Sequence, residues 1–189
     1  KHYSTKYIVN PAVFTLKYEK NIEIYPSLGS IRVCIVTSAQ PRKGYQQFLE
    51  IAKNSELKGV NYMVISQDDL DSKLKSVTHV KPSSDNEYVD VLKQCHFMLS
   101  TSTFEGFGLP LIEAMALGIV PIAFYNPGMD EFNTEKNITI IDNVVDFDNK
   151  ITKIVSEEDR YIKLSNSVIK SASVFTTQNF YFSMMDKIK

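Results

Sequence analysis

The sequence predicts a single Rossmann-like α/β domain, a doubly wound parallel sheet, from two observations. Short apolar runs rich in β-branched residues alternate with helical patterns from about residue 31 to residue 141. These runs are continuously apolar, which is typical of strands buried on both faces of a parallel sheet. Right-handed crossovers between such strands place helices on both faces. The 189 residues suffice for one domain with a sizeable core.

The elements begin after residues 1–30, which we expect to be a connector into the domain spanning 31–189. The run Ile31–Val36 (IRVCIV) predicts a buried strand. A turn, QPRKG, precedes an apolar stripe that predicts a helix over 45–52. The next expected elements are a strand, a short polar helix and a strand, in that order, at 62–66, 69–76 and 77–80.

A capping-box pair, Ser84 and Glu87, predicts the start of the next helix, and Tyr88 is expected on its apolar face. Pro110 and Gly118 bound a further helix, because proline suits a first helical turn and glycine the position after the last. Pro121 indicates a sheet edge or a strand end. The remaining expected elements are strands at 97–101, 119–124 and 138–141, and tail helices whose apolar stripes lie within 147–155, 161–172 and 180–188.

Composition excludes several classes of protein. The formal net charge of −1 gives no support for a nucleic-acid partner. No apolar run approaches the roughly 20 residues needed to span a bilayer. Cys34 and Cys95 lie in apolar stretches and are expected to be buried thiols in a reducing compartment. The histidines show no ligand spacing relative to them, so no metal site is predicted. Because the chain starts at Lys1, we expect a fragment of a longer protein.

The loop after the strand at 97–101 carries the most informative motif, EGFG at 105–108. Gly106 and Gly108 precede a predicted helix, where glycines allow close backbone approach and leave N–H groups free. A helix N-terminus carries roughly half a positive charge and favours an anion such as a diphosphate. The alternative is a tight strand-to-helix turn without a ligand.

Two carboxylates and two cations accompany this loop. Glu113 sits between apolar neighbours, where a carboxylate needs partners that ligand hydroxyls could provide. Glu105 precedes it with the spacing E-x7-E. Arg42 and Lys43 follow the first strand, at the edge of a parallel sheet where the 105–110 loop is also expected. They could neutralise a diphosphate, although a solvated turn is the alternative.

The stretch FEGFGLPLIEAMALGIVPI resembles the E-x7-E signature of retaining GT-B glycosyltransferases of family 4, also called glycosyl transferases group 1. The loop QPRKG and its helix resemble that family's phosphate-binding Lys–Gly turn. The order of elements is similar to the C-terminal, nucleotide-sugar-binding half of the family. YIVNPAVF at 7–14 is similar to the connector that enters this half.

The resemblance implies a hexosyltransferase-type enzyme that transfers a sugar from a nucleotide diphosphate sugar to an acceptor hydroxyl with retained configuration, without a metal or other cofactor. Glu113 would bind the ribose, and Lys43 with Arg42 would bind the diphosphate. Glu105 would hold hydroxyls of the donor sugar. The remaining donor-binding positions would be Gly44, Gly106, Phe107, Gly108 and Leu109.

Three places in the sequence depart from the family pattern. Ser38 stands where the family often has an arginine, and Ser66–Asp69 where it often has a glycine-rich turn. His96 stands where an aspartate is common, and we interpret it as structural. Asp69 and Asp71 spell the metal motif of another glycosyltransferase fold, but acidic residues opening a helix explain them better.

The expected partners are the donor and the absent N-terminal GT-B half that carries the acceptor site, so the fragment alone is expected to be inactive. The expected role is polysaccharide biosynthesis in the cytoplasm, with peripheral association with the inner face of the membrane left open. A nucleotide-sugar epimerase and a non-catalytic nucleotide-sugar-binding module are the alternatives. The base, the sugar and the acceptor stay undetermined, although the loop at 81–86 is expected near the base.

Overall fold

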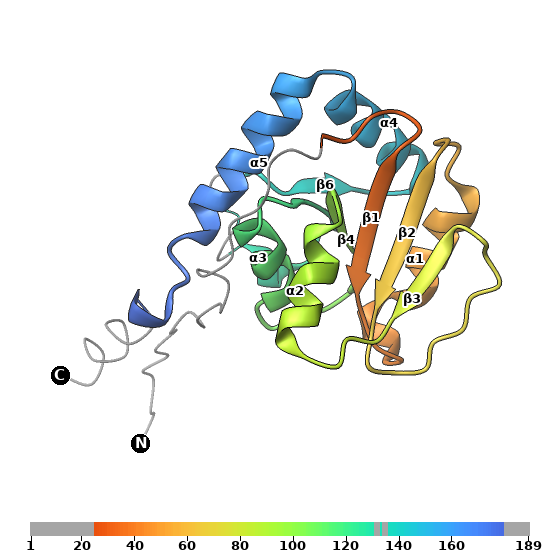
Figure 1. The fold of residues 1–189 in the computed structure, drawn as a ribbon, viewed down its shortest axis with the longest axis horizontal. Coiled ribbons are helices and arrows are strands. Elements are labelled where there is room, and N and C mark those ends of the chain that lie inside the picture. The colour runs from red at the N-terminus through yellow and green to blue at the C-terminus, as the bar shows by residue number, and fades with distance from the viewer. Residues whose placement is uncertain (1–24, 131–132, 134–135, 180–189) are drawn as a thin grey trace.

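The computed structural model describes residues 25–130, 133 and 136–179, which form a six-stranded sheet with helices on both faces (Figure 1). Each pair of neighbouring strands is parallel. The strand order is β3-β2-β1-β4-β5-β6, which confirms the predicted doubly wound α/β class. The strand bounds are β1 Ile31–Val36, β2 Val60–Ile65, β3 Val77–Val80, β4 Phe97–Ser100, β5 Val120–Phe124 and β6 Thr139–Ile141.

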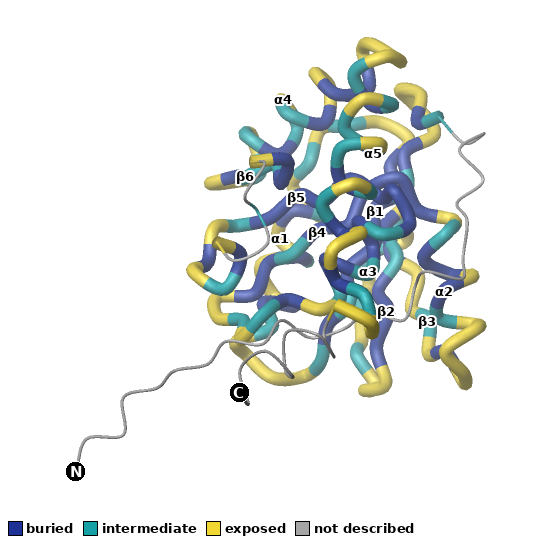
Figure 2. The backbone as a smooth tube through the Cα atoms, turned by 90° about the vertical axis from the view of Figure 1, so that its left-hand side faces the viewer, coloured by how far each residue is buried: buried dark blue, intermediate teal, exposed yellow. Residues whose placement is uncertain are grey.

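Two apolar clusters hold the helices to the sheet, one on each face. α2 (Asp85–Lys93), α3 (Leu109–Ala116) and the end of α5 (Glu158–Ala172) contribute to the first cluster. α1 (Tyr45–Asn54) and α4 (Val144–Val155) contribute to the second. Figure 2 shows the strands as the buried centre between these layers. This burial on both faces explains why the strands read as continuous apolar runs.

The strand order creates a switch point between β1 and β4. The chain leaves β1 for α1 on one face of the sheet and leaves β4 for α3 on the other. The two loops therefore diverge from adjacent strands and open a crevice at the carboxyl edge, where ligands of such sheets bind. The fold thus directs attention to the loops that follow β1 and β4.

The polar helix predicted at 69–76 is wrong, because this stretch contains neither helix nor strand. Leu70 and Leu74 pack against the α1–α4 cluster. The Tyr45 hydroxyl donates to the Asp71 carbonyl at 2.9 Å, and the Leu74 N–H donates to the Ser72 hydroxyl at 3.2 Å. Serine thereby competes with helical hydrogen bonds, and tertiary contacts override a weak helix preference.

Pro121 lies in β5, between β4 and β6, so the sheet-edge interpretation of this residue is wrong. It is the second residue of its strand, which agrees with the alternative of a strand end. The capping box of α2 is confirmed on one side, because the Glu87 N–H donates to the Ser84 hydroxyl at 3.2 Å. The Glu87 carboxylate accepts instead from the N–H of Ser83, at 2.7 Å.

Some predictions lie outside the described residues, namely most of the connector (1–24) and the last helix (180–188). The described end of the connector is anchored, since the Tyr25 hydroxyl donates to the Val155 carbonyl at 2.6 Å. Cys34 and Cys95 are buried free thiols, as predicted.

Phe147→Ala should lower the free energy of unfolding by about 3–5 kcal/mol, because this α4 side chain is fully buried in the second cluster. Val145→Ala in the same helix is the control, since Val145 is 64% exposed and should change that free energy by less than about 0.5 kcal/mol. Urea unfolding measures both. Equal effects of the two substitutions would contradict the described orientation of α4.

Candidate functional site

The loops that follow β1 and β4 are joined by hydrogen bonds. The Thr103 N–H donates to the Arg42 carbonyl at 2.9 Å, and the Thr101 hydroxyl donates to the Gly44 carbonyl at 2.7 Å. The Arg42 guanidinium donates to the Phe104 carbonyl at 3.4 Å. The expectation from the sequence that these two loops share one edge of the sheet is therefore confirmed.

Gly44 permits this contact. It follows the 3-10 turn Pro41–Lys43 and precedes α1 with φ 70°, in the left-handed region that favours glycine. A Cβ placed on Gly44 would lie 2.0 Å from the Thr101 carbonyl oxygen. No side chain fits there, so the Lys–Gly turn can approach β4 only because this residue is glycine.

Lys43 and Glu105, two of the predicted site residues, form an ion pair between the joined loops. The Lys43 Nζ donates to both carboxylate oxygens of Glu105, at 2.8 and 3.0 Å. Their side chains are only 20% and 13% exposed, so both charges are largely removed from water. An ammonium carries three donor hydrogens, which leaves Lys43 one for a further acceptor.

The N-terminus of α3 opens beside this pair. Gly108 is its N-cap with φ 84°, and no side chain caps the helix within the described residues. The first N–H groups of a helix have no partner within the helix and carry partial positive charge. A Cβ on Gly106 would meet no atom within 4 Å, so packing in the protein does not require glycine there. Pro110 has no N–H, and the Leu111 N–H donates to the Gly108 carbonyl at 3.0 Å, so among the first three positions of α3 it is Leu109 that keeps an N–H for an anion.

The side chains of Phe107 and Leu109, two other predicted loop residues, have different surroundings. Phe107 packs edge-to-face on Phe175, with ring centroids 5.5 Å apart, which fixes the loop to the chain beyond α5. Leu109 is 38% exposed at the first position of α3.

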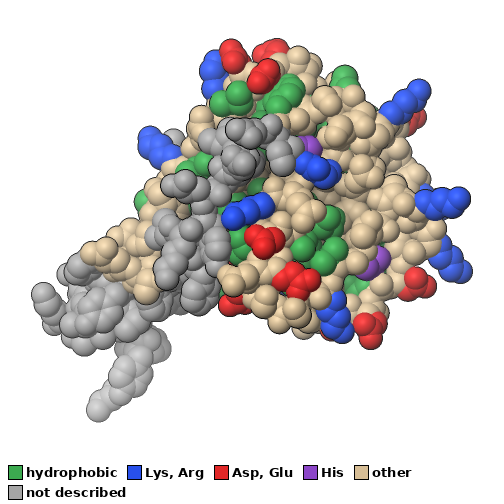
Figure 3. Space-filling model, in the orientation of Figure 1, with side chains coloured by type: hydrophobic (Ala, Val, Ile, Leu, Met, Phe, Trp, Pro, Cys, Tyr) green, Lys and Arg blue, Asp and Glu red, His purple; other side chains and the backbone are tan. Residues whose placement is uncertain are grey.

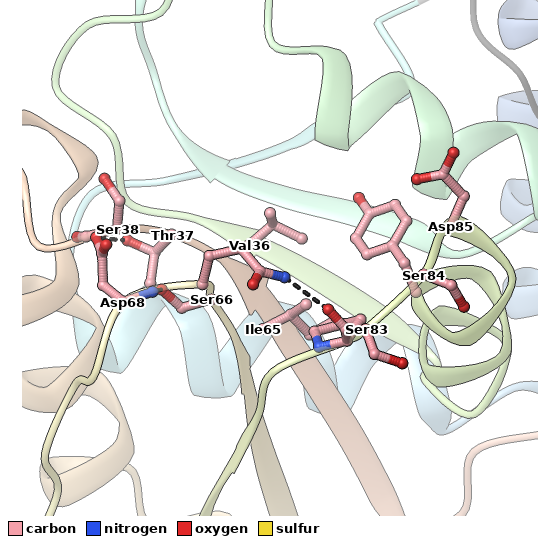
Figure 4. Close-up of a pocket in the computed structure, with 12 residues that line it drawn as sticks. Val36, Thr37, Ser38, Ile65, Ser66, Asp68, Ser83, Ser84 and Asp85 are labelled. Carbon is pink, nitrogen blue, oxygen red and sulfur yellow. Dashed lines mark hydrogen bonds between the residues drawn. The ribbon is translucent and has the colours of Figure 1, made fainter.

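A pocket of about 640 Å³ lies at the carboxyl ends of β1, β2 and β3 (Figure 4). Thr37 and Ser38 from the β1 loop and Ser66 and Asp68 from the β2 loop line one part of it. Residues 82–85, within the loop that the sequence places near the base, line another part. The Thr37 hydroxyl also donates to the Lys43 carbonyl at 3.2 Å, which links the pocket wall to the Lys–Gly turn.

Tyr88 is one of the residues that line the pocket, and it connects the pocket to Glu113. The Tyr88 hydroxyl donates to Glu113 Oε2 at 2.7 Å. Burial raises the pKa of the Glu113 carboxyl, the Tyr88 hydrogen bond lowers it, and the charge of Asp85 raises it, with a net pKa above the usual value. Burial, followed by the adjacent Glu113 charge, raises the pKa of Tyr88, so its hydroxyl stays protonated and donates.

The sequence interpretation missed two contacts of the pocket. Tyr88 was assigned to the apolar face of α2, although a hydroxyl on such a face calls for a buried acceptor. Asp68 lies in the turn that departs from the family pattern, and its carboxylate accepts from the Ala39 N–H at 2.6 Å. Asp68 thereby fixes the start of the loop that carries Lys43.

The remaining candidates are structural. His96 is buried, and its Nδ1 accepts from the Arg32 N–H at 3.0 Å. Asp69 contacts the exposed Lys81 at 3.4 Å. Among the described residues, no group of three His, Cys, Asp or Glu side chains could hold a metal ion. On the face shown in Figure 3, acidic and basic side chains are interspersed. None of the helices in residues 25–130, 133 and 136–179 is long and apolar enough to cross a membrane.

Comparisons with known proteins agree with this fold. A family model described as glycosyl transferases group 1 matches residues 18–173. No curated protein matches the chain. The crystal structure of TarM is similar with a TM-score of 0.68 and 19% identity, over 87% of this chain and 36% of TarM. The chain thus spans about a third of the length of TarM.

Two further structures share the fold. The C-terminal domain of LpcC, a glycosyl transferase group 1 protein from Francisella tularensis, has a TM-score of 0.63 and 21% identity, over 78% of this chain and 87% of that domain. Anabaena Alr3699/HepE, solved in complex with UDP and glucose, has a TM-score of 0.69 and 16% identity, over 85% of this chain and 48% of its own.

Gly44→Ala should destabilise the protein by about 2–4 kcal/mol, because the methyl group adds left-handed strain and a clash with the Thr101 carbonyl. Gly106→Ala is the matched control and should alter stability by less than about 0.5 kcal/mol, because its Cβ enters open space. Thermal unfolding of both variants measures the difference. A fully stable Gly44→Ala variant would refute the close approach of the two loops.

Glu113→Gln should stabilise the protein relative to the wild type more strongly at pH 8 than at pH 4. The folded pKa of Glu113 lies above its unfolded value of 4.5, so ionisation costs stability as the pH rises through that window. Below the unfolded pKa, the carboxyl is protonated in both states and the cost vanishes. The measurement is the difference in melting temperature between the variant and the wild type across this pH range. A difference that does not vary with pH would contradict the burial of the Glu113 charge.

Proposed function

The chain belongs to the glycosyl transferases group 1 family, and from this premise we propose that it is the donor-binding, C-terminal half of a retaining GT-B glycosyltransferase of family 4. The observation that carries the proposal is the Lys43–Glu105 pair beside the uncapped N-terminus of α3. A cation, a carboxylate and the positive end of a helix meet there at the switch point of the sheet. Such a constellation suits a sugar diphosphate, which is anionic at one end and rich in hydroxyls at the other.

Each part of the donor has a counterpart at this edge. The base enters the pocket lined by residues 82–85, and the ribose hydroxyls bind the Glu113 carboxylate. The diphosphate binds Lys43, Arg42 and the backbone N–H groups of residues 106–109. Gly44 contributes by bringing Lys43 to this position, and Glu105 holds hydroxyls of the sugar.

The proposed reaction breaks the bond between the sugar C1 and the diphosphate oxygen. The acceptor hydroxyl oxygen forms the new bond to C1, on the same face of the ring, and its proton passes to the departing diphosphate oxygen. Negative charge grows on the departing diphosphate, and preplaced cations and helix dipoles stabilise that charge. These groups provide the stabilisation without a metal ion.

The Lys43–Glu105 pair has to adapt when the donor binds. In the structure, Glu105 engages Lys43 through both carboxylate oxygens. A diphosphate competes for the ammonium, and this competition releases carboxylate oxygens toward the sugar hydroxyls. Donor binding therefore exchanges one internal ion pair for contacts on two parts of the ligand.

The acceptor site belongs to a separate N-terminal half in this proposal, so the chain alone transfers little or no sugar. The role we propose for the whole enzyme is polysaccharide biosynthesis in the cytoplasm. A nucleotide-sugar epimerase would bind the diphosphate through the same residues. A non-catalytic module would explain why Ser38 stands where the family often has an arginine. The E-x7-E spacing of Glu105 and Glu113 favours the transferase over the epimerase.

Calorimetric titration with UDP, GDP, dTDP and ADP tests the proposal. We expect one nucleotide to bind, and Glu113→Ala and Lys43→Ala each to weaken it about 10- to 100-fold, the range for lost hydrogen bonds to charged groups. Lys153→Ala is the control, because this exposed lysine lies in α4, away from the carboxyl edge. Unchanged affinity in both site variants would refute the assigned roles.

A further inference from the structure

The contact between Tyr88 and Glu113 joins two helices that pack on the same face of the sheet. Tyr88 lies in α2, Glu113 lies in α3, and the hydroxyl-to-Oε2 distance is 2.7 Å. Tyr88 lines the large pocket at the carboxyl edge. The hydrogen bond therefore lies at the boundary between that pocket and the helix that carries the E-x7-E motif.

The Glu113 carboxylate has acceptor positions that Tyr88 does not use. An ionised carboxylate offers about four acceptor positions on its two oxygens. Tyr88 occupies one of them, and no other hydrogen bond to the Glu113 side chain occurs within the described part of the chain. The unused positions are sufficient for two vicinal hydroxyls of a ribose.

The Tyr88 hydroxyl is held in place by its surroundings. The tyrosine packs against the apolar cluster shared by α2 and α3. The start of its helix is fixed by the Ser84 cap, which accepts from the Glu87 N–H. A tyrosine also has few rotatable bonds, so packing of the ring determines where its hydroxyl lies.

We propose that Tyr88 is a positioning residue that holds the Glu113 carboxylate for the ribose and thereby makes the site selective for ribonucleoside over deoxyribonucleoside diphosphates. This inference rests on the proposed function, because it takes Glu113 as the ribose ligand. A flexible carboxylate could turn toward water when a hydroxyl is missing. A fixed, largely buried carboxylate loses a partner instead, and sites of that kind reject analogues that lack a hydroxyl.

The donor class follows from this selectivity. A deoxythymidine diphosphate sugar presents one ribose hydroxyl, whereas uridine and guanosine diphosphate sugars present two. Both uridine and guanosine carry the two hydroxyls, so the Tyr88–Glu113 pair distinguishes ribose from deoxyribose. The pocket determines which base binds.

The test compares the affinity for UDP with that for 2′,3′-dideoxy-UDP, and the same pair for GDP, by calorimetry. For the nucleotide that binds, the wild type should prefer the ribo form about 10- to 100-fold. Tyr88→Phe should reduce this ratio at least about threefold and leave the affinity for the dideoxy form unchanged. Tyr161→Phe is the control, because it removes a buried hydroxyl that donates to the His96 carbonyl at the amino end of β4. Its ratio should equal that of the wild type.

A merely structural role of Tyr88 would lower both affinities equally, and that result would overturn the inference. An unchanged or larger ratio in Tyr88→Phe would overturn it as well, the latter by showing that Tyr88 competes with the ribose. Glu113→Ala separates this inference from the proposed function. If Glu113→Ala abolishes the preference and Tyr88→Phe does not, only the role of Tyr88 fails. If Glu113→Ala leaves the preference intact, the ribose role of Glu113 fails and the inference fails with it.

Discussion

The close approach of Gly44 to the Thr101 carbonyl is the constraint on which the site depends. No residue with a Cβ can occupy a position where that atom would lie 2.0 Å from a backbone oxygen. The resulting contact joins the loops of two adjacent strands whose helices leave on opposite faces of the sheet. It also places Lys43 within 2.8 Å of Glu105, although 61 residues separate them in the sequence. The geometry of one glycine thus determines where opposite charges meet.

Glu113 illustrates a second feature, a group that is unfavourable for folding and suited to binding. Burial raises the pKa of its carboxyl, so the ionised form costs stability that the Tyr88 hydrogen bond only partly offsets. A ligand hydroxyl would complete the hydrogen bonding of that carboxylate. Groups that destabilise the folded protein but can bind a ligand are expected at functional sites, where perturbed pKa values concentrate.

The strands were predictable from sequence because burial on both faces leaves an unambiguous apolar run, as in Ile31–Val36. The loops around Lys43 and Glu105 were predictable because parallel strands end at one edge. The failures share a cause, which is that local patterns do not report long-range contacts. The local pattern of residues 69–76 predicts a helix, but contacts with Tyr45 and with the α1–α4 cluster hold this stretch in an irregular conformation. Tyr88 read as apolar because nothing near it in sequence reveals the carboxylate 25 residues away.

The central claim is that one ligand spans the pocket, Glu113 and the Lys43–Glu105 pair. A crystal structure of the chain with its bound nucleoside diphosphate tests this most directly. The account predicts the base in the pocket, the ribose on Glu113, and the phosphates against Lys43 and the N–H groups at the start of α3. A nucleotide bound elsewhere, or phosphates that avoid this helix end while Lys43 stays paired with Glu105, would contradict it.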